Sequence, residues 1–349
     1  MNGPGRDTRV PVHVLTGFLG SGKTTLLRHM LADPDLSDTA VVINEFGEVG
    51  LDHLLVRAVA EDVVLLSSGC LCCSVRDDLV STLAELNAMM RTGDIPAFAR
   101  VVVETTGMAD PAPIMQAILS EQRLTPWFRL GQVITTVDAV NGDQTLVRHR
   151  EARQQLATAD RVILTKPDLV DESDCAALLE KLRTFNPGAA FATASKGRLT
   201  AGAILDDGQG QHDQEDQWRR AGSILPPASK GPGDNRPLGP LLSHHDEAIR
   251  TFTVQLERPV EWSVFVDWLE LLLANRGDSI LRVKGLLGVT DDERPVVVQG
   301  VQHVLYPIDR LPTWPKGTSS PGWIVFIARD LTARAIENSL RSVYEFSLA

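Results

Sequence analysis

The segment that most constrains this sequence is Gly17-Phe-Leu-Gly-Ser-Gly22-Lys23-Thr24-Thr25. It follows the apolar run Val10–Thr16 and precedes an amphipathic stretch, so it joins a predicted strand to a helix. Its glycines let successive backbone N–H groups turn around a polyphosphate, and the helix N-terminus adds a positive dipole end. A merely flexible glycine turn is the alternative. The predicted phosphate cradle comprises Gly17, Gly20, Ser21, Gly22, Lys23, Thr24 and Thr25, with Lys23 on the β- and γ-phosphates and Thr24 on Mg²⁺.

Short apolar runs alternate with amphipathic stretches from Val10 to about Leu205. Most runs are continuous in Val, Ile and Leu, which is typical of strands buried on both faces of a parallel sheet. One helix is predicted over Arg76–Met90, and another, capped by Ser173, reaches about Phe185. The alternation predicts right-handed β-α-β units and a doubly wound, mostly parallel α/β sheet. Its predicted strands are Val10–Thr16, Ala40–Asn44, Val63–Leu66, Arg100–Glu104, Gln132–Val137, Arg161–Thr165 and Ala189–Thr193.

The composition changes after this first domain, which we place at residues 1–205. Residues 206–245 are dense in Gly, Pro, Gln and Asp and predict a linker. Residues 246–349 show one strand, a helix, several strands and a final helix, which indicates a smaller α+β domain. The predicted elements are Thr251–Leu256, Val260–Ala274, Ile280–Leu287, Pro295–Val301, Trp323–Ile327 and Thr332–Val343.

Two later segments complete the predicted nucleotide site. Glu104 ends an apolar strand and Gly107 follows three positions later, and strand ends of such a sheet converge on the ligand. We expect Glu104 in the Mg²⁺ shell and the Gly107 N–H at the γ-phosphate. Thr165-Lys-Pro-Asp168 fits guanine recognition, with Asp168 accepting from guanine N1 and N2 and Lys166 along the ring. This pattern favours GTP over ATP; a polar turn at a strand end is the alternative.

Three of the four cysteines fall within Cys70–Cys73. Such close thiols rarely form a disulfide framework, so Cys70, Cys72 and Cys73 indicate metal or redox chemistry. Glu45 and Glu48 could add oxygen ligands for Zn²⁺ or Co²⁺. Because adjacent Cys72 and Cys73 are awkward as joint ligands of one ion, we favour two thiolates completed by oxygen, water or nucleotide.

The charge balance disfavours several classes of partner. The 349 residues carry 45 acidic and 34 basic side chains, a net charge of −11. An acidic surface repels nucleic acid and anionic lipid, and no apolar run approaches the roughly 20 residues of a membrane span. Since the first residues lack the apolar core of a secretory signal, we expect a cytoplasmic protein, monomeric or weakly self-associating.

Four motifs occur in an order that resembles the CobW-type GTPase metallochaperones, and two C-terminal segments are similar to that family's C-terminal domain. The resemblance implies slow GTP hydrolysis, a Zn²⁺ or Co²⁺ site at the Cys-x-Cys-Cys segment, and delivery of the metal to client metalloproteins. Thr165 departs from the family's common Asn. The segments that carry the resemblance are Gly17–Thr25, Asn44–Gly50, Cys70–Cys73, Glu104–Pro111, Arg282–Leu287 and Arg294–His303.

The motif order suggests a mechanism. GTP–Mg²⁺ would order residues 45–50 through contacts with the γ-phosphate, and the following cysteine segment would then bind metal in a nucleotide-dependent way. Metal and GTP would bind with positive coupling of about 1–3 kcal/mol. Two rivals stay open: a P-loop phosphotransferase with a small-molecule acceptor, and a thiol redox sensor coupled to GTP binding.

Overall fold

The computed structural model describes residues 7–44, 65–67, 75–196, 198–205, 249–315 and 318–346. The chain divides into two compact units that interleave in sequence. The first unit comprises Met1–Thr145, Ala159–Cys175 and Phe191–Gln209, and the second comprises Leu146–Thr158, Ala176–Ala190 and Gly210–Ala349. The predicted linker, 206–245, lies outside the described residues.

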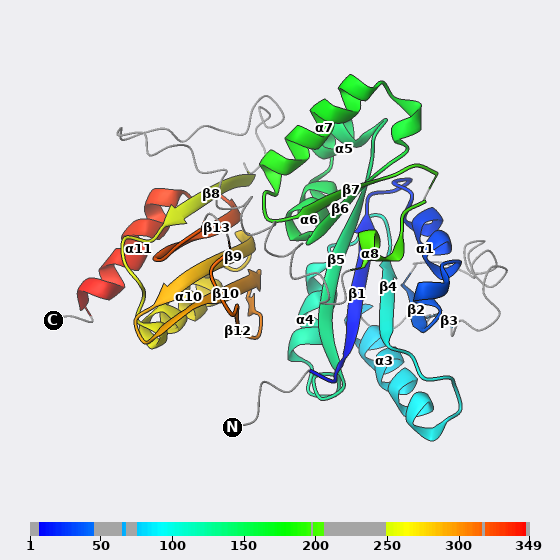
Figure 1. Ribbon diagram of the computed structural model, residues 1–349, viewed down its shortest axis with the longest axis horizontal. Coiled ribbons are helices and arrows are strands. Elements are labelled where there is room, and N and C mark those ends of the chain that lie inside the picture. The colour runs from blue at the N-terminus through cyan, green and yellow to red at the C-terminus, as the bar shows by residue number, and fades with distance from the viewer. Residues whose placement is uncertain are drawn as a thin grey trace. The chain divides into compact units, whose positions relative to one another are not determined.

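A seven-stranded sheet with the order β3-β2-β4-β1-β5-β6-β7 organises the first part of the chain (Figure 1). The pairings among β1 to β6 are parallel. Every predicted strand is present, with ends shifted by a few residues. The strands are β1 (Val10–Gly17), β2 (Thr39–Asn44), β3 (Leu65–Ser67), β4 (Arg100–Thr105), β5 (Phe128–Asp138), β6 (Arg161–Thr165) and β7 (Ala190–Ala194).

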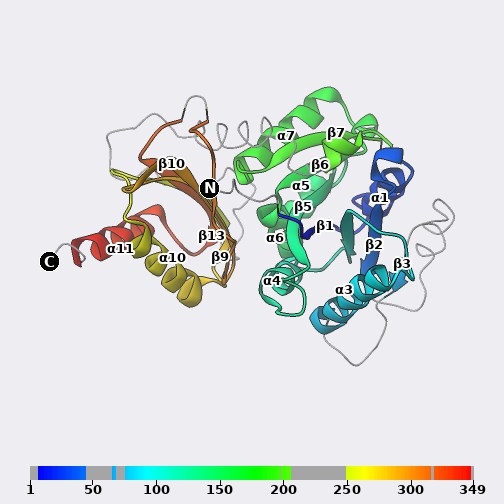
Figure 2. The ribbon, with the colours of Figure 1, turned by 60° about the horizontal axis from the view of Figure 1, so that its bottom comes forward.

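The strand order determines which face each helix covers. The chain runs outward from β1 to β2 and β3, then returns through β4 and continues to β5. Because crossovers are right-handed, outward and returning helices lie on opposite faces. Helices α1 (Lys23–Leu31) and α8 (Ala201–Ile204) share one core, while α3 (Val75–Thr92) and α4 (Ala112–Ser120) pack together on the other face (Figure 2). The predicted doubly wound α/β fold is confirmed.

Helix α7 (Glu172–Phe185) corrects one detail of the prediction. Ser173 lies inside the helix, so its predicted role as the N-terminal cap is wrong. The N–H groups of Asp174 and Cys175 both donate to the Asp171 carbonyl, which starts the helix earlier. The acidic side chains of the first turn, Glu172 and Asp174, also favour this start because they face the positive end of the helix dipole. The remaining helices of this part are α5 (Gly142–Arg148), α6 (Arg150–Thr158) and the short 3₁₀ turns η1 (Pro34–Leu36) and η2 (Pro167–Leu169).

The C-terminal residues form a separate six-stranded antiparallel sheet, which confirms the predicted α+β domain. Helices α10 (Trp262–Arg276) and α11 (Ala333–Phe346) both contribute to the larger of its cores. The two-residue strands β11 and β12 were too short to predict. The strands are β8 (Ile249–Gln255), β9 (Ile280–Val289), β10 (Asp292–Val301), β11 (Val304–Leu305), β12 (Asp309–Arg310) and β13 (Gly322–Arg329).

Aromatic side chains of α10 anchor this C-terminal core. Phe265 is fully buried and packs against Trp268, with ring centroids 5.4 Å apart. The Trp268 indole N–H also donates to Ser339 Oγ of α11 at 3.0 Å. This contact satisfies the polar atom of a buried aromatic ring and ties the two helices together.

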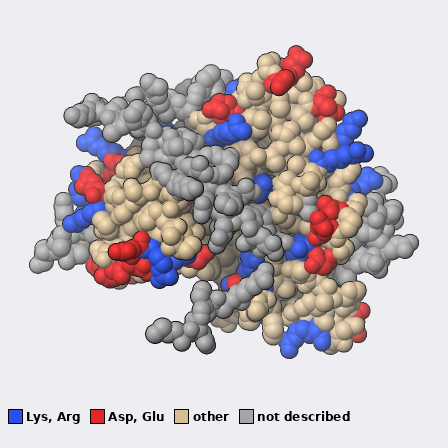
Figure 3. Space-filling model, viewed as in Figure 1, with Lys and Arg blue, Asp and Glu red and all other residues tan. Residues whose placement is uncertain are grey.

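One face of the described residues carries mixed charge. Figure 3 shows Lys and Arg interspersed with Asp and Glu on the face in view, over the described residues. No helix in the described ranges is both long and apolar enough to cross a membrane.

Replacing Phe265 with alanine should lower the free energy of unfolding by about 3–5 kcal/mol, because it leaves a cavity in a closed core. The matched control on the same helix is Leu271→Ala, whose side chain is 64% exposed, and which should change stability by less than about 0.5 kcal/mol. Urea unfolding followed by tryptophan fluorescence measures both. Equal losses in the two variants would contradict the assigned packing of α10.

Candidate functional site

The loop between β1 and α1 follows a backbone path that requires glycine at two of its positions. Gly17 has φ +142°, and a Cβ built on it would lie 2.3 Å from Thr136 Oγ1 and 2.7 Å from Ser21 Oγ. Gly22 has φ +91° at the N-terminus of α1. Only glycine fits both positions without strain. The glycines of the motif are therefore required by the backbone path.

Lys23 is the first residue of α1 and is 9% exposed. Its Nζ donates to the carbonyl oxygens of Gly17 at 2.9 Å and Phe18 at 3.3 Å. The ammonium thus lies against the same loop that is predicted to hold phosphates. Its contact with the β- and γ-phosphates stays a prediction.

Thr24 and Glu104 meet in space across 80 positions of sequence. Thr24 Oγ1 donates to Glu104 Oε1 at 2.9 Å, and Glu104 is 6% exposed. Glu104 is paired with Leu15 and Ile43, which belong to the core beneath α1, so its side chain faces the loop. A hydroxyl and a carboxylate are the hard oxygen donors that Mg²⁺ prefers, so the pair fits that ion.

Gly107 packs directly on the phosphate loop. A Cβ on Gly107 would lie 2.6 Å from Leu19 Cδ2 and 2.7 Å from the Leu19 backbone nitrogen. The segment after β4 therefore approaches the loop backbone more closely than any side chain would allow. The predicted γ-phosphate contact of the Gly107 N–H is compatible with this approach.

Buried hydroxyls beneath the loop form a network that sequence reasoning missed. Thr105 Oγ1 donates to Thr16 Oγ1 at 2.9 Å, and the hydroxyls of Ser21 and Thr136 are 2.6 Å apart. Threonine is ordinary in strands, so its identity gave no signal. Only the paired register of the strand ends reveals that these hydroxyls meet.

The predicted base-recognition segment is connected to the phosphate loop. Thr165 Oγ1 donates to the Ser21 carbonyl at 2.7 Å and to the Val137 carbonyl at 3.2 Å. The residue that replaces the common Asn thus anchors the loop through its hydroxyl. Asp168 accepts a hydrogen bond from Ser195 Oγ at 3.2 Å. Ser195, which follows β7, was also missed by the sequence reasoning.

Asp138, the last residue of β5, joins this cluster. Its Oδ2 lies 2.7 Å from Lys166 Nζ, which also donates to the Gly20 carbonyl at 2.9 Å. Burial alone would raise the pKa of Asp138. Hydrogen bonds from Lys166, the Val140 N–H and Asn141, with the charge of Lys166, outweigh it and hold this pKa below its usual value. The sequence reasoning ended this strand at Val137 and so overlooked Asp138.

The predicted transition-metal ligands Glu45, Glu48, Cys70, Cys72 and Cys73 lie outside the described residues. Within the part of the chain that the structure describes, no group of three or more metal-ligating side chains occurs. The strands that lead into both segments are described.

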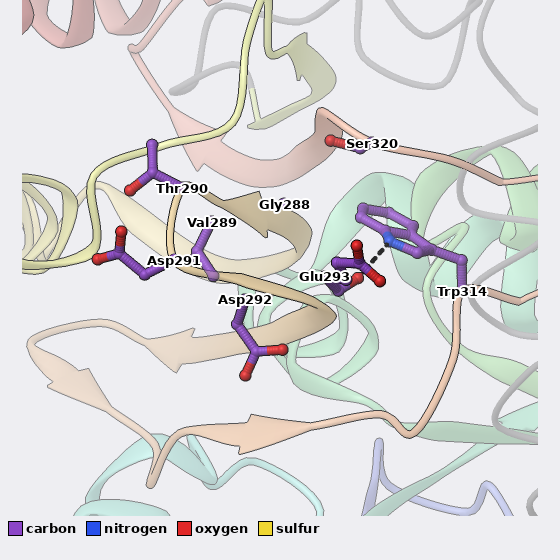
Figure 4. A pocket seen from close by; sticks show the side chains of 8 residues that line it. All are labelled: Gly288, Val289, Thr290, Asp291, Asp292, Glu293, Trp314 and Ser320. Carbon is purple, nitrogen blue, oxygen red and sulfur yellow. Dashed lines mark hydrogen bonds between the residues drawn. The ribbon is translucent and has the colours of Figure 1, made fainter.

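A pocket of about 420 Å³ lies elsewhere, at the β9–β10 turn of the C-terminal domain (Figure 4). Asp291, Asp292 and Glu293 line it, and the Trp314 indole N–H donates to the Glu293 carbonyl at 3.2 Å. Hydrogen bonds from Arg294 hold the pKa of Asp292 far below its usual value. Because Arg294 and Arg310 already pair with Asp292, the pocket is not a free acidic cluster.

The model of the CobW/HypB/UreG nucleotide-binding domain matches residues 11–193, and that of the cobalamin synthesis protein cobW C-terminal domain matches residues 249–344. The chain belongs to the CobW family. The zinc chaperone YjiA of Escherichia coli is 34% identical over 94% of this chain and 96% of the relative. The zinc chaperone CobW of Pseudomonas aeruginosa is 30% identical over 96% of this chain and 91% of the relative. The predicted resemblance is confirmed.

A solved structure of a CobW-family protein shows the same architecture. It is a Zn(II)-bound triple mutant of the YjiA GTPase, with a TM-score of 0.69 and 30% identity. The alignment covers 96% of this chain and 99% of that one. Both domains of the present chain therefore have counterparts in this relative.

Gly107→Ala should weaken nucleotide binding at least about tenfold, or about 1.4 kcal/mol, because the added methyl group displaces the backbone of Leu19 in the phosphate loop. Gly202→Ala is the matched control, since a Cβ there meets no atom within 4 Å, and it should leave binding unchanged. Fluorescence titration with a labelled guanine nucleotide measures both. Unaltered affinity in the Gly107 variant would contradict the close approach.

Proposed function

We propose that this protein is a cytoplasmic, GTP-hydrolysing metallochaperone that binds Zn²⁺ and passes it to client metalloproteins under nucleotide control. The domain of residues 1–205 would carry the nucleotide site and the metal site. Residues 206–245 would link it to the C-terminal domain, residues 246–349, which would contact the client. The observation that carries the proposal is the hydrogen bond from Thr24 to Glu104. It brings a P-loop hydroxyl and a strand-end carboxylate together, as a nucleotide-bound Mg²⁺ requires.

The triphosphate site would use the cradle as follows. Lys23 and the backbone N–H groups of the loop would hold the β- and γ-phosphates. Thr24 and Glu104 would hold Mg²⁺, which when bound neutralises charge on the phosphate oxygens. The N–H of Gly107 would contact the γ-phosphate, so that this segment distinguishes GTP from GDP.

Base choice would rest on Asp168. Its carboxylate can accept hydrogen bonds from the N1 and N2 donors of guanine, a pattern that adenine does not offer. The bond from Ser195 orients this carboxylate. Thr165 would contribute by fixing the phosphate loop rather than by contacting the base.

The metal site is supported by where its flanking strands end. Strands β3, β2 and β4 are neighbours, and Ile43 of β2 is in register with both Ser67 and Glu104. Glu45 follows β2 directly, and Cys70 is three positions after Ser67, within about 11 Å of it for an extended chain. The described ends of β2 and β3 thus lie at the edge of the sheet where Glu104 meets Thr24, and the predicted ligand segments follow them in sequence. We infer that Glu45 or Glu48 and two of the thiolates form an incomplete, releasable metal shell.

The relatives favour zinc as the cargo. Two of them are named zinc chaperones, and one solved structure has zinc bound. Soft thiolates with oxygen also suit Co²⁺, but at equal supply the affinity order favours Zn²⁺. The zinc-bound relative is a triple mutant in which a glutamate and two cysteines are replaced by alanine. Binding of zinc by itself is therefore a poor test of the proposed metal site. The dependence of zinc affinity on the bound nucleotide is a better test.

The testing experiment titrates zinc into protein loaded with GDP and with a non-hydrolysable GTP analogue. Affinity should be higher in the analogue state by about 5- to 150-fold, as for other coupled sites. A variant with all three clustered cysteines replaced by serine should bind zinc equally in the two states. Equal zinc affinity of the wild type in both states would rule out nucleotide control.

Glu104→Gln should slow GTP hydrolysis at least about 100-fold, because the amide removes a charged Mg²⁺ ligand. Glu85→Gln, an exposed change on α3, is the control and should hydrolyse normally. Release of inorganic phosphate without any acceptor measures both. Phosphate transfer only to an added small molecule would favour the phosphotransferase, and turnover changed by reversible thiol oxidation in metal-free protein would favour the redox sensor.

A further inference from the structure

We propose that Asp138 is a positioning residue of the nucleotide site, which holds Lys166 between the base-recognition segment and the phosphate loop. The inference rests on the guanine-nucleotide binding proposed above. It assigns Asp138 a role in affinity for any purine nucleotide, separate from the choice of base by Asp168.

The carboxylate of Asp138 is held on both oxygens. Its position at the end of β5 is in register with Thr165 of β6, and its side chain is 11% exposed. Oδ1 accepts from the Val140 N–H at 2.8 Å, and Oδ2 accepts from Asn141 Nδ2 at 3.3 Å and Lys166 Nζ at 2.7 Å. The bonds from Val140 and Asn141 hold the carboxylate in the orientation in which it accepts from Lys166.

Lys166 combines an uncommon backbone conformation with an ammonium that is bound at two points. Its φ is +57°, in the left-handed region that side chains rarely adopt, and it precedes the η2 turn that carries Asp168. Its ammonium bridges Asp138 and the Gly20 carbonyl. The bridge therefore joins the end of β5, the phosphate loop and the base-recognition turn.

The geometry separates two roles within one site. With its ammonium held by Asp138 and the Gly20 carbonyl, the aliphatic stem of Lys166 would present the surface along which a purine ring lies. Asp168 is on the same turn but bonds Ser195 rather than Lys166. Loss of the Asp138 charge should loosen the lysine and weaken every purine nucleotide alike, whereas a change at Asp168 should alter which purine is preferred.

A double-mutant cycle tests the assignment in metal-free full-length protein. GDP affinity is measured by calorimetry for the wild type, Asp138→Asn, Lys166→Met and the double variant. Asp138→Asn should weaken GDP binding about tenfold, as expected for a charge-assisted hydrogen bond. In the Lys166→Met background the same change should alter GDP affinity less than about twofold, since the ammonium that Asp138 binds is absent.

Asp38→Asn provides the matched control, because Asp38 pairs with Arg100 at the surface near the start of β2. It should leave GDP affinity unchanged. An unchanged affinity for Asp138→Asn, or an equal loss with and without Lys166, would overturn the proposal. The second result would mean that Asp138 acts on the fold and not through the lysine.

Measurements with ADP and xanthosine diphosphate separate this inference from the proposed function. Asp138→Asn should weaken all the diphosphates by one factor, while Asp168→Asn should shift preference from GDP to the xanthine nucleotide. A wild type that binds ADP as well as GDP would refute the guanine choice, yet the cycle with either nucleotide would still decide on Asp138. A changed base preference in Asp138→Asn would overturn the separate role.

Discussion

The hydrogen bond between Thr24 and Glu104 depends on one constraint, the common direction of the sheet strands. In a parallel sheet the carboxyl ends of all strands meet at one edge. Thr24 lies in the first turn of α1, the helix after β1, and Glu104 lies near the end of β4, the strand beside β1. A carboxylate on the opposite strand face would point away from α1. Only strand-end side chains on the face of the sheet that α1 covers can therefore reach the phosphate loop.

Short polar contacts at this edge hold the loop in place. Thr165 binds the Ser21 carbonyl, and Lys166 binds that of Gly20. Ser21 also meets Thr136 beneath the loop. Thr136 and Thr165 belong to β5 and β6, and Lys166 directly follows β6, so these contacts tie the loop backbone to the ends of the sheet. Contacts of this kind lower the cost of ordering a site when its ligand binds.

Local patterns predicted the parts of the site, but not how they are joined. The glycine spacing and the apolar runs gave the loop, the strands and Glu104, because each is encoded in consecutive residues. Asp138, Thr136 and Ser195 escaped prediction, since their roles depend on the register between strands far apart in sequence. The Ser173 cap failed because Asp171 already starts the helix. The thiols and Glu45 remain predictions, outside the described residues.

The central claim is that GTP–Mg²⁺, with Glu104 on the ion and the Gly107 N–H on the γ-phosphate, and a metal at the cysteine segment would stabilise one another. Thermodynamic linkage requires this coupling to be reciprocal. The most direct measurement is the affinity for a non-hydrolysable GTP analogue with and without saturating Zn²⁺, with GDP as reference. We expect saturating Zn²⁺ to raise the affinity for the analogue more than the affinity for GDP. The ratio of these two increases should equal the ratio of the zinc affinities of the analogue-bound and GDP-bound protein. Equal zinc effects on both nucleotides would contradict it.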